Sequence, residues 1–345
     1  MANLITIGPD VESQPLNDNF AALNDDIINI PHGLYRNAII NGNFDVWQRG
    51  ATFSAVSGYT ADRWKFDRTG TGTTTISRST DVPDGKSTYS LRFSGDYAPG
   101  EVQDITYYME GKDAAKFAGQ QVTISLKQKG AVSAGSTSLQ IYVAYATAPD
   151  NFVNIHQVGV SSPYAASGNF TEVVYTLTLP AVSGGYPISN GLAIIIRHTH
   201  GGATGTLTGN ISQVQFCAGG SALPYQPRSF AEELALCLRY FYRMKAEQLY
   251  AQFGAGTNTS TTQAIIAVPL KTVMRIAPTL KWGGALRLAS GATSEAVTNL
   301  TTAGSAATSH TMGLMATVSG GLTPAAGVVL SSLDTTAYID FDAEM

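Results

Sequence analysis

The sequence predicts a mainly β protein built around a β-sandwich of jelly-roll type. Apolar residues recur with period two from Ala38 to about Gln226, and Gly, Pro, Ser and Asn punctuate the pattern. No helical pattern interrupts this region, which favours a sandwich. The pattern predicts strands over Thr73–Arg78, Tyr89–Ser94, Val122–Gln128, Ser138–Tyr145, Phe170–Leu179, Leu192–His198 and Ile211–Phe216.

Residues 1–36 are predicted to form an N-terminal anchor and oligomerisation segment with one short helix. Ser13 can cap this helix, and Pro15 lies in its first turn, where a missing N–H costs nothing. A helix this short needs a partner surface, either on its own chain or on partner chains. We favour partner chains because Pro31 and Gly33 separate the helix from the rest of the chain. The seam recurs at spacings of four and three residues: Leu16, Phe20, Leu23, Ile27 and Ile30.

The jelly roll is assigned to residues 37–228, and a linking helix to 229–253. Ser229 and Glu232 form a capping box at the start of this helix. Its apolar face either covers the sandwich or forms a second oligomer seam. The residues of that face are Phe230, Leu234, Cys237, Phe241 and Met244.

The remainder, 254–345, is predicted to be a small C-terminal β-domain. Gly254–Ser260 has the composition of a flexible link. The strands predicted after it are Gln263–Val268, Thr279–Leu288, His310–Val318, Gly327–Leu330 and Ala337–Phe341.

Composition excludes several classes of function. Charged residues make up only 13% of the chain and the formal net charge is −4, so the basic footprint of a nucleic-acid-binding protein is missing. The start lacks the features of a secretory signal, and no apolar run is long enough to insert into a membrane.

The two cysteines, Cys217 and Cys237, are too few for a disulfide framework and are expected to be buried free thiols.

Three segments carry a resemblance to a known family: Asn37-Ala-Ile-Ile-Asn-Gly-Asn-Phe-Asp-Val-Trp-Gln-Arg-Gly50 with Tyr59–Trp64, the stretch Leu223–Tyr242, and the end Tyr338–Met345. Together they resemble bacteriophage tail-fibre and receptor-binding virion proteins with a carbohydrate-binding-module-like (galactose-binding-like) jelly roll. The stretch Pro15–Asn24 is similar to short helices that anchor phage fibres to the particle.

The resemblance implies a virion protein, assembled in the host cytoplasm and often trimeric, that binds host cell-surface polysaccharide. Its N-terminal segment would contact other virion proteins. No cofactor is expected, although the family's structural calcium would make Asp45 the candidate oxygen ligand. The alternative is a structural connector or head-decoration fibre without sugar binding, because one fold hosts many functions.

Sugar recognition uses aromatic platforms with polar neighbours, and tyrosine supplies both. The candidate carbohydrate contacts are Tyr107, Tyr108, Tyr142 and Tyr164. Within Ser138–Tyr145, alternation places Tyr145 on the apolar face and Tyr142 on the other face, which makes Tyr142 the better candidate. Trp47 and Trp64 lie inside the family-like motif and are expected to pack structurally.

No catalytic residue is assigned, and the protein is expected not to be an enzyme. A glycan depolymerase, the weaker alternative, needs two carboxylates across a cleft. The acidic residues of the early loops show no spacing that marks such a pair: Asp62, Asp67, Asp96, Glu101 and Asp104. His198 and His200 share one face of a strand, but a metal site needs three or four ligands. We interpret them as a polar strand end.

Overall fold

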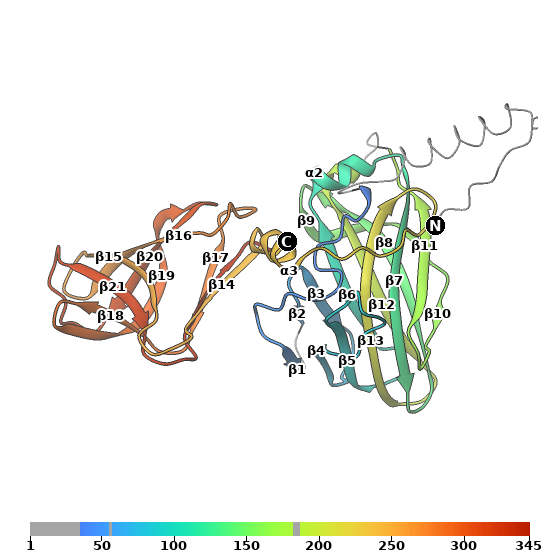
Figure 1. Cartoon of the computed structure of the whole chain (residues 1–345), viewed down its shortest axis with the longest axis horizontal. Coiled ribbons are helices and arrows are strands. Elements are labelled where there is room, and N and C mark those ends of the chain that lie inside the picture. Colours follow the sequence, from blue (N-terminus) through green and yellow to red (C-terminus); the bar gives the residue numbers. More distant parts are fainter. Residues whose placement is uncertain (1–34, 55–56, 182–186) are drawn as a thin grey trace, which may run out of the picture.

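Figure 1 shows the computed structural model, which describes residues 35–54, 57–181 and 187–345. Two β units lie side by side along the long axis, and a short helix, α3 (Phe230–Leu238), lies between them. The predicted N-terminal helix and its seam (Leu16, Phe20, Leu23, Ile27 and Ile30) lie outside the described residues. In the part of the chain that the structure describes, no helix has the length and apolar character to cross a bilayer.

The larger unit is a sandwich of two antiparallel sheets, as predicted. The first sheet has the order β1 (Thr52–Ser54), β4 (Thr74–Ser79), β5 (Ser90–Tyr97), β13 (Gly205–Ala218), β7 (Gln121–Val132) and β11 (Thr171–Thr178). In the second sheet, β9 (Asn151–Val160) and β10 (Tyr164–Ala165) pair with β8 (Ser136–Ala148), followed by β12 (Leu192–Gly201), β6 (Val102–Met109), β3 (Trp64–Arg68) and β2 (Gly58–Tyr59). From β5 to β8 the chain changes sheet at every connection, and it does so again from β10 to β13, which is the winding of a jelly roll.

Period-two alternation explains why these sheets pack face to face. On β7 the side chains of Val122, Ile124 and Leu126 are buried, and on β12 those of Ile194 and Ile196 are buried as well. All five belong to one apolar core between the sheets. A short helix, α2 (Gly111–Ala114), lies at one end of the sandwich (Figure 1). The 3-10 helix η2 (Ala115–Phe117) follows it directly, and a second one, η3 (Ile188–Asn190), contacts it.

The predicted linking helix is correct at its start and wrong beyond Leu238. The capping box of Ser229 and Glu232 is present, but the chain continues as a strand, β14 (Phe241–Lys245). The spacing of Phe241 and Met244 favours a helix and does not fit strand alternation, because residues three apart lie on opposite faces of a strand. Pairing with β22 (Tyr338–Asp342) nevertheless makes this stretch a strand. Phe230 is therefore 61% exposed rather than part of a long buried face.

The smaller unit contains a three-stranded sheet and a closed barrel. In the sheet, β22 lies between β14 and β17 (Thr279–Gly283). The barrel has the order β15 (Gln252–Asn258), β16 (Gln263–Pro269), β20 (Thr311–Val318), β19 (Thr293–Ala307), β18 (Leu286–Ser290) and β21 (Gly327–Ser332). One apolar core fills both, and it includes Ile266, Leu314 and Phe341.

Two predictions in this unit are wrong. The stretch taken for a flexible link forms β15, whose small residues allow close pairing. A Cβ on Gly256 would lie 1.8 Å from the carbonyl oxygen of Ile265 on β16. The single strand predicted over Thr279–Leu288 is two strands, β17 and β18, separated by Gly284 at φ +72°.

The prediction for the cysteines is confirmed, since Cys217 and Cys237 are buried and free.

Candidate functional site

The outer face of the second sheet, which points away from the sandwich core, is the first part of the candidate site. Register places one row of side chains across six strands on this face. The row consists of Tyr59, Lys65, Thr106, Ile195, Tyr142 and Val160. The prediction that Tyr142 and Tyr145 face opposite ways is confirmed, since Tyr142 lies opposite Ile195 of the outer face and Tyr145 lies opposite Leu192 of the core.

A fixed guanidinium organises the polar part of this face. Arg197 donates through Nε and Nη2 to the two carboxylate oxygens of Asp104, at 2.8 and 2.7 Å. These hydrogen bonds raise the pKa of Arg197 above its usual value. The guanidinium carbon lies 4.6 Å from the ring centroid of Tyr142, whose hydroxyl donates to Gln140 Oε1 at 3.3 Å. Next to this group, Lys65 and Asp67 form an ion pair at 2.8 Å.

The floor of the face is apolar and aromatic. Tyr108, Ala144, Ala193 and Ile195 form a small buried cluster, and the partly buried Tyr59, Tyr142, Phe152 and Met345 pack on it. The rings of Tyr108 and Phe152 stack, with centroids 4.3 Å apart and an interplanar angle of 27°. A flat apolar floor edged by hydrogen-bonding groups suits a ligand with both apolar faces and polar edges.

A cleft of about 500 Å³ opens over one end of this floor, between the sandwich and the smaller unit. We call it the junction cleft. Its residues come from three places: the sheet face, the β8–β9 hairpin, and two segments of the smaller unit. They are Lys65 and Tyr108, then Pro149–Val153, then Arg275, Ile276, Glu344 and Met345. The volume falls in the range of small-molecule sites, and such sites favour junctions between units.

Buried charges hold the smaller unit against the sandwich and so form one wall of the junction cleft. Arg63, whose side chain is fully buried, pairs with Glu344, whose side chain is 2% exposed. Arg63 also donates to the carbonyl of Tyr108 and lies 3.5 Å from the ring centroid of Tyr240. The carboxylate of Glu344 keeps the pKa of Arg63 above its usual range despite burial.

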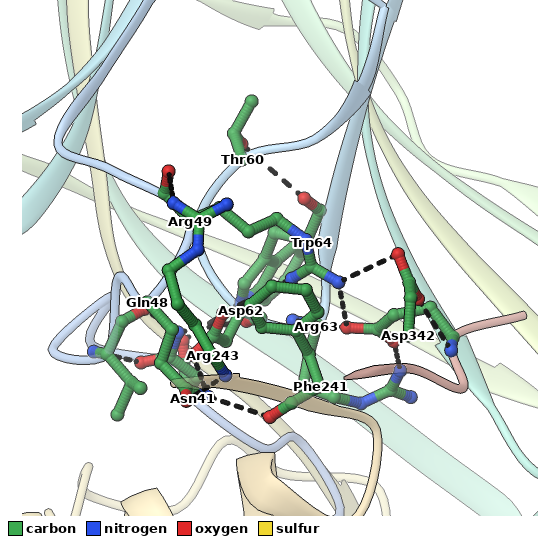
Figure 2. A network of polar contacts seen from close by, with 12 residues as sticks. Asn41, Gln48, Arg49, Thr60, Asp62, Arg63, Trp64, Phe241, Arg243 and Asp342 are labelled. Carbon is green, nitrogen blue, oxygen red and sulfur yellow. Dashed lines mark hydrogen bonds and ion pairs between the residues drawn. The ribbon is translucent and has the colours of Figure 1, made fainter. Parts of the chain in front are cut away.

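A second arginine completes this junction, as Figure 2 shows. Arg49 donates to Asp62 at 3.2 Å and lies 3.5 Å from the ring centroid of Phe241 on β14. Gln48 donates to both Asp62 and the carbonyl of Phe241, at 2.9 and 2.8 Å. Burial raises the pKa of Asp62 to about 7, although Arg49 opposes the shift.

The family-like opening motif is the scaffold of this junction. Asn41 has φ +59°, which asparagine tolerates, and its side chain hydrogen-bonds Val46 and the carbonyl of Asp62. Trp64 donates to the Asn41 carbonyl at 2.9 Å and is fully buried. The prediction that Trp64 and Trp47 pack structurally is confirmed. The three segments that carry the resemblance therefore meet at one place.

The structure brings together two of the four predicted sugar-contact tyrosines. Tyr142 lies on the outer face and Tyr108 lies in its floor. The prediction that Tyr107 contacts a sugar is wrong. Tyr107 is 2% exposed in the core, and its hydroxyl accepts a hydrogen bond from the Ile40 N–H and donates one to the Ala38 carbonyl. Alternation puts neighbouring residues on opposite faces, so Tyr107 and Tyr108 cannot both face a ligand. Tyr164 packs against the core and donates to the carbonyl of Val174.

Several residues of the site were not singled out from the sequence. Phe152 lies on β9 and Arg197 on β12. Because side chains alternate between the two faces of a strand, this alternation could have placed both residues on the outer face. Arg275 lies between predicted strands, in a stretch without local pattern, and only the tertiary structure brings it to the cleft.

His198 and His200 lie at the end of a strand, as interpreted, since β12 ends at Gly201, but they are not a polar surface. Both are buried, and their rings pack on Phe93 and Tyr97 at centroid distances of 4.3 and 4.2 Å. Burial lowers the pKa of His198 to about 3. These imidazoles are inward-facing members of β12, because the alternation of that strand continues to its end.

The residues around Asp45 do not fit a calcium ion. Burial, followed by the charge of Glu233, raises the pKa of Asp45 to about 6. Glu233 is already paired with Arg228 at 3.3 Å. The described ranges hold no cluster of three or more His, Cys, Asp or Glu side chains that could bind a metal, whereas calcium takes six to eight oxygens.

Comparison with known proteins identifies no family for this chain. No family model and no curated protein matches it. Among solved structures, it is similar to a carbohydrate-binding module of the β-sandwich superfamily (10% identity, 50% of this chain and 63% of that chain, TM-score 0.35). It is also similar to the enzymatically active domain of tailspike protein 4 from bacteriophage CBA120 (16%, 54% and 22%, TM-score 0.35). A third is the CBM22-1 xylan-binding domain from Paenibacillus barcinonensis (11%, 50% and 94%, TM-score 0.30).

The chain thus spans less than two thirds of the first two of these structures. At such TM-scores the similarities assign neither a ligand nor a biological setting to this chain. The assignment of a mainly β jelly roll rests on its own strand order and register.

Proposed function

We propose that this protein is a non-enzymatic attachment protein of a tailed bacteriophage particle. It binds host surface glycan along the outer face of the second sheet and in the junction cleft. The observation that carries the proposal is the combination of the Tyr108–Phe152 stack, the Tyr142 ring and the Arg197–Asp104 pair beside one cleft. Aromatic faces pack on the apolar faces of sugar rings, and fixed polar groups select hydroxyls.

The phage setting is supported by the resemblance of Asn37–Trp64, Leu223–Tyr242 and Tyr338–Met345 to tail-fibre proteins. These segments build the junction that shapes the cleft. Assembly in the host cytoplasm, incorporation into the virion through the N-terminal segment and a homotrimeric state belong to the same proposal.

The absence of catalysis is also part of the proposal. Three carboxylates of the outer face and the cleft are engaged in ion pairs: Asp104 with Arg197, Asp67 with Lys65, and Glu344 with Arg63. A general acid must instead hold a proton near neutral pH, in surroundings that oppose its charge. Release of reducing ends from host polysaccharide by the full chain would show that a depolymerase is the better assignment.

The experiment that tests the proposal is binding of the full-length chain to an array of bacterial surface polysaccharides. We expect binding that Tyr142→Ala abolishes while the denaturation midpoint stays unchanged. Exposed Tyr250 lies on the smaller unit away from the cleft, so Tyr250→Ala serves as the matched control. No binding to any polysaccharide, together with ordered incorporation into particles, would favour the structural connector.

The oligomeric state is measured separately by light scattering. We expect the mass of a trimer for the full chain and a lower mass for Phe20→Asp, which places a charge in the predicted seam. A monomeric full-length chain would contradict this part of the proposal.

A further inference from the structure

The junction cleft contains a guanidinium that is held in place but not neutralised. Arg275 donates through Nε to the carbonyl of Ala343 and through Nη2 to that of Glu344, each at 2.8 Å. Its own backbone N–H donates to the carbonyl of Arg239, also at 2.8 Å. These partners are uncharged carbonyls, so they orient the guanidinium without cancelling its charge.

Two of the other charged side chains that line the cleft are already engaged in ion pairs. Lys65 is paired with Asp67 at 2.8 Å, and Glu344 is paired with Arg63 and lies 3.6 Å from Arg49. Arg275 forms no ion pair with any described carboxylate, and its third guanidinium nitrogen, Nη1, makes no hydrogen bond to a described residue. That nitrogen is not among the buried unpartnered atoms, so it is accessible at the surface of a residue that lines the cleft.

Asp150 is the one remaining charged side chain of the lining. It belongs to the β8–β9 hairpin, whereas Arg275 belongs to the wall that the smaller unit supplies. Its Oδ1 accepts a hydrogen bond from the Gly111 N–H at 2.7 Å, which directs that oxygen toward the end of the sandwich. The side-chain charges of the lining cancel by number, but the available cation, Arg275, and the available acidic side chain, Asp150, lie on different walls.

We propose that the junction cleft binds an acidic sugar, and that Arg275 is the residue that selects it through the sugar's carboxylate. This inference rests on the proposed glycan-binding function and adds the chemical class of the ligand. A guanidinium bonds a carboxylate more strongly than a neutral hydroxyl, because both partners are charged and the donors are fixed in a planar fork. The stacked rings of Tyr108 and Phe152 supply the apolar surface against which the sugar ring packs.

The proposal also explains why the smaller unit is held so firmly against the sandwich. Arg275 hydrogen-bonds the backbone of Ala343 and Glu344, and the Glu344 side chain is held by Arg63 of the sandwich. The ion pair of Arg63 therefore positions Arg275 over the sheet face. Neither unit alone has both the aromatic floor and the cation.

The test compares acidic polysaccharides with their own carboxyl-reduced forms, in which each carboxylate has become a primary alcohol. Both forms are printed on one array and probed with the full-length chain. We expect binding to acidic polysaccharides that weakens about tenfold on carboxyl reduction and falls with added salt. Equal binding of both forms, or binding restricted to neutral polysaccharides, would overturn the inference while the proposed function stood.

Variants assign the effect to the residue. Arg275→Gln should bind the acidic form about tenfold more weakly and should weaken binding of the reduced form by much less. Arg275→Lys keeps the positive charge but lacks the planar guanidinium. Its affinity for the acidic form should lie between those of the wild type and Arg275→Gln. Arg287→Gln is the matched control, because Arg287 bonds Ser331 and Ser294 on the barrel and does not line the cleft.

Loss of folding is separated from loss of recognition by the urea midpoint of each variant. Unchanged binding of the acidic form by folded Arg275→Gln would show that Arg275 has only a structural role, through its hydrogen bonds to Ala343 and Glu344. If no polysaccharide of any kind binds the wild-type chain, the proposed function itself fails, and the inference fails with it.

Discussion

Replacing Glu344 with alanine is expected to destabilise the whole protein, because it leaves a buried arginine without its counter-charge. The Arg63 side chain is fully buried and that of Glu344 is 2% exposed. Breaking a buried pair by removing one partner costs about 3–5 kcal/mol. An exposed pair is worth about 0–1 kcal/mol, and Lys127–Glu172, with side chains 31% and 51% exposed, is of that kind. Glu172→Ala is therefore the control.

Urea denaturation of the full chain measures the difference. With an m-value of about 3 kcal/mol per M, Glu344→Ala should lower the midpoint by about 1 M or more, and Glu172→Ala by less than about 0.3 M. Tryptophan fluorescence reports on both units, because Trp64 lies in the sandwich and Trp282 on β17.

A double variant separates the lost charge partner from lost packing. Arg63→Met combined with Glu344→Ala should recover much of the stability, since no unpaired charge then remains buried. The reasoning is refuted if Glu344→Ala behaves like Glu172→Ala, or if the double variant is as unstable as the sum of the two single changes.

Three further predictions concern the core of the sandwich, the junction and the barrel. His198→Leu should reduce the loss of stability on acidification. Its folded pKa of about 3 lies below the ordinary 6.5, so stability is complete above pH 6.5 and falls by up to about 1.4 kcal/mol per unit as the pH drops from 6.5 toward 3. Urea midpoints at pH 7 and pH 5 check this, and an unchanged pH dependence would contradict it. The fragment 38–228 should unfold at lower urea than the sandwich within the full chain, because Arg63 loses Glu344 and Asp62 loses the Gln48 bridge to Phe241; equal midpoints would show that the junction adds no stability. Gly256→Val should disrupt the barrel, because a Cβ there meets the Ile265 carbonyl at 1.8 Å; a folded variant with the wild-type midpoint, measured through Trp282, would contradict it.

Much of the sandwich could be predicted because strand alternation is local. Period two placed Val122, Ile124 and Leu126 on one face, and the structure buries all three. The same rule separated Tyr142 from Tyr145. The same rule puts Tyr107 and Tyr108 on opposite faces of β6. That strand was not recognised in the sequence, so both tyrosines were predicted to contact the ligand.

The failures occurred where a distant partner decides local structure. Phe241 and Met244 continue the helical spacing of α3, yet they form a strand because β22, about a hundred residues later, offers a hydrogen-bonding edge. The Gly-rich stretch at 254–260 has the composition of a linker, but pairing with both β16 and β21 makes it a barrel strand.

The sequence by itself determined the fold class, the inward and outward faces of the recognised strands, the helix start at Ser229 and the two buried thiols. Each follows from residue types and short spacings that act within one element. The tertiary structure alone decided the candidate site. Arg63 and Glu344 are 281 residues apart in the chain, and Arg275 reaches the cleft because this pair and the contacts of Gln48 and Arg49 hold the smaller unit in place. Such contacts depend on how two units pack, and no periodicity within either unit encodes them.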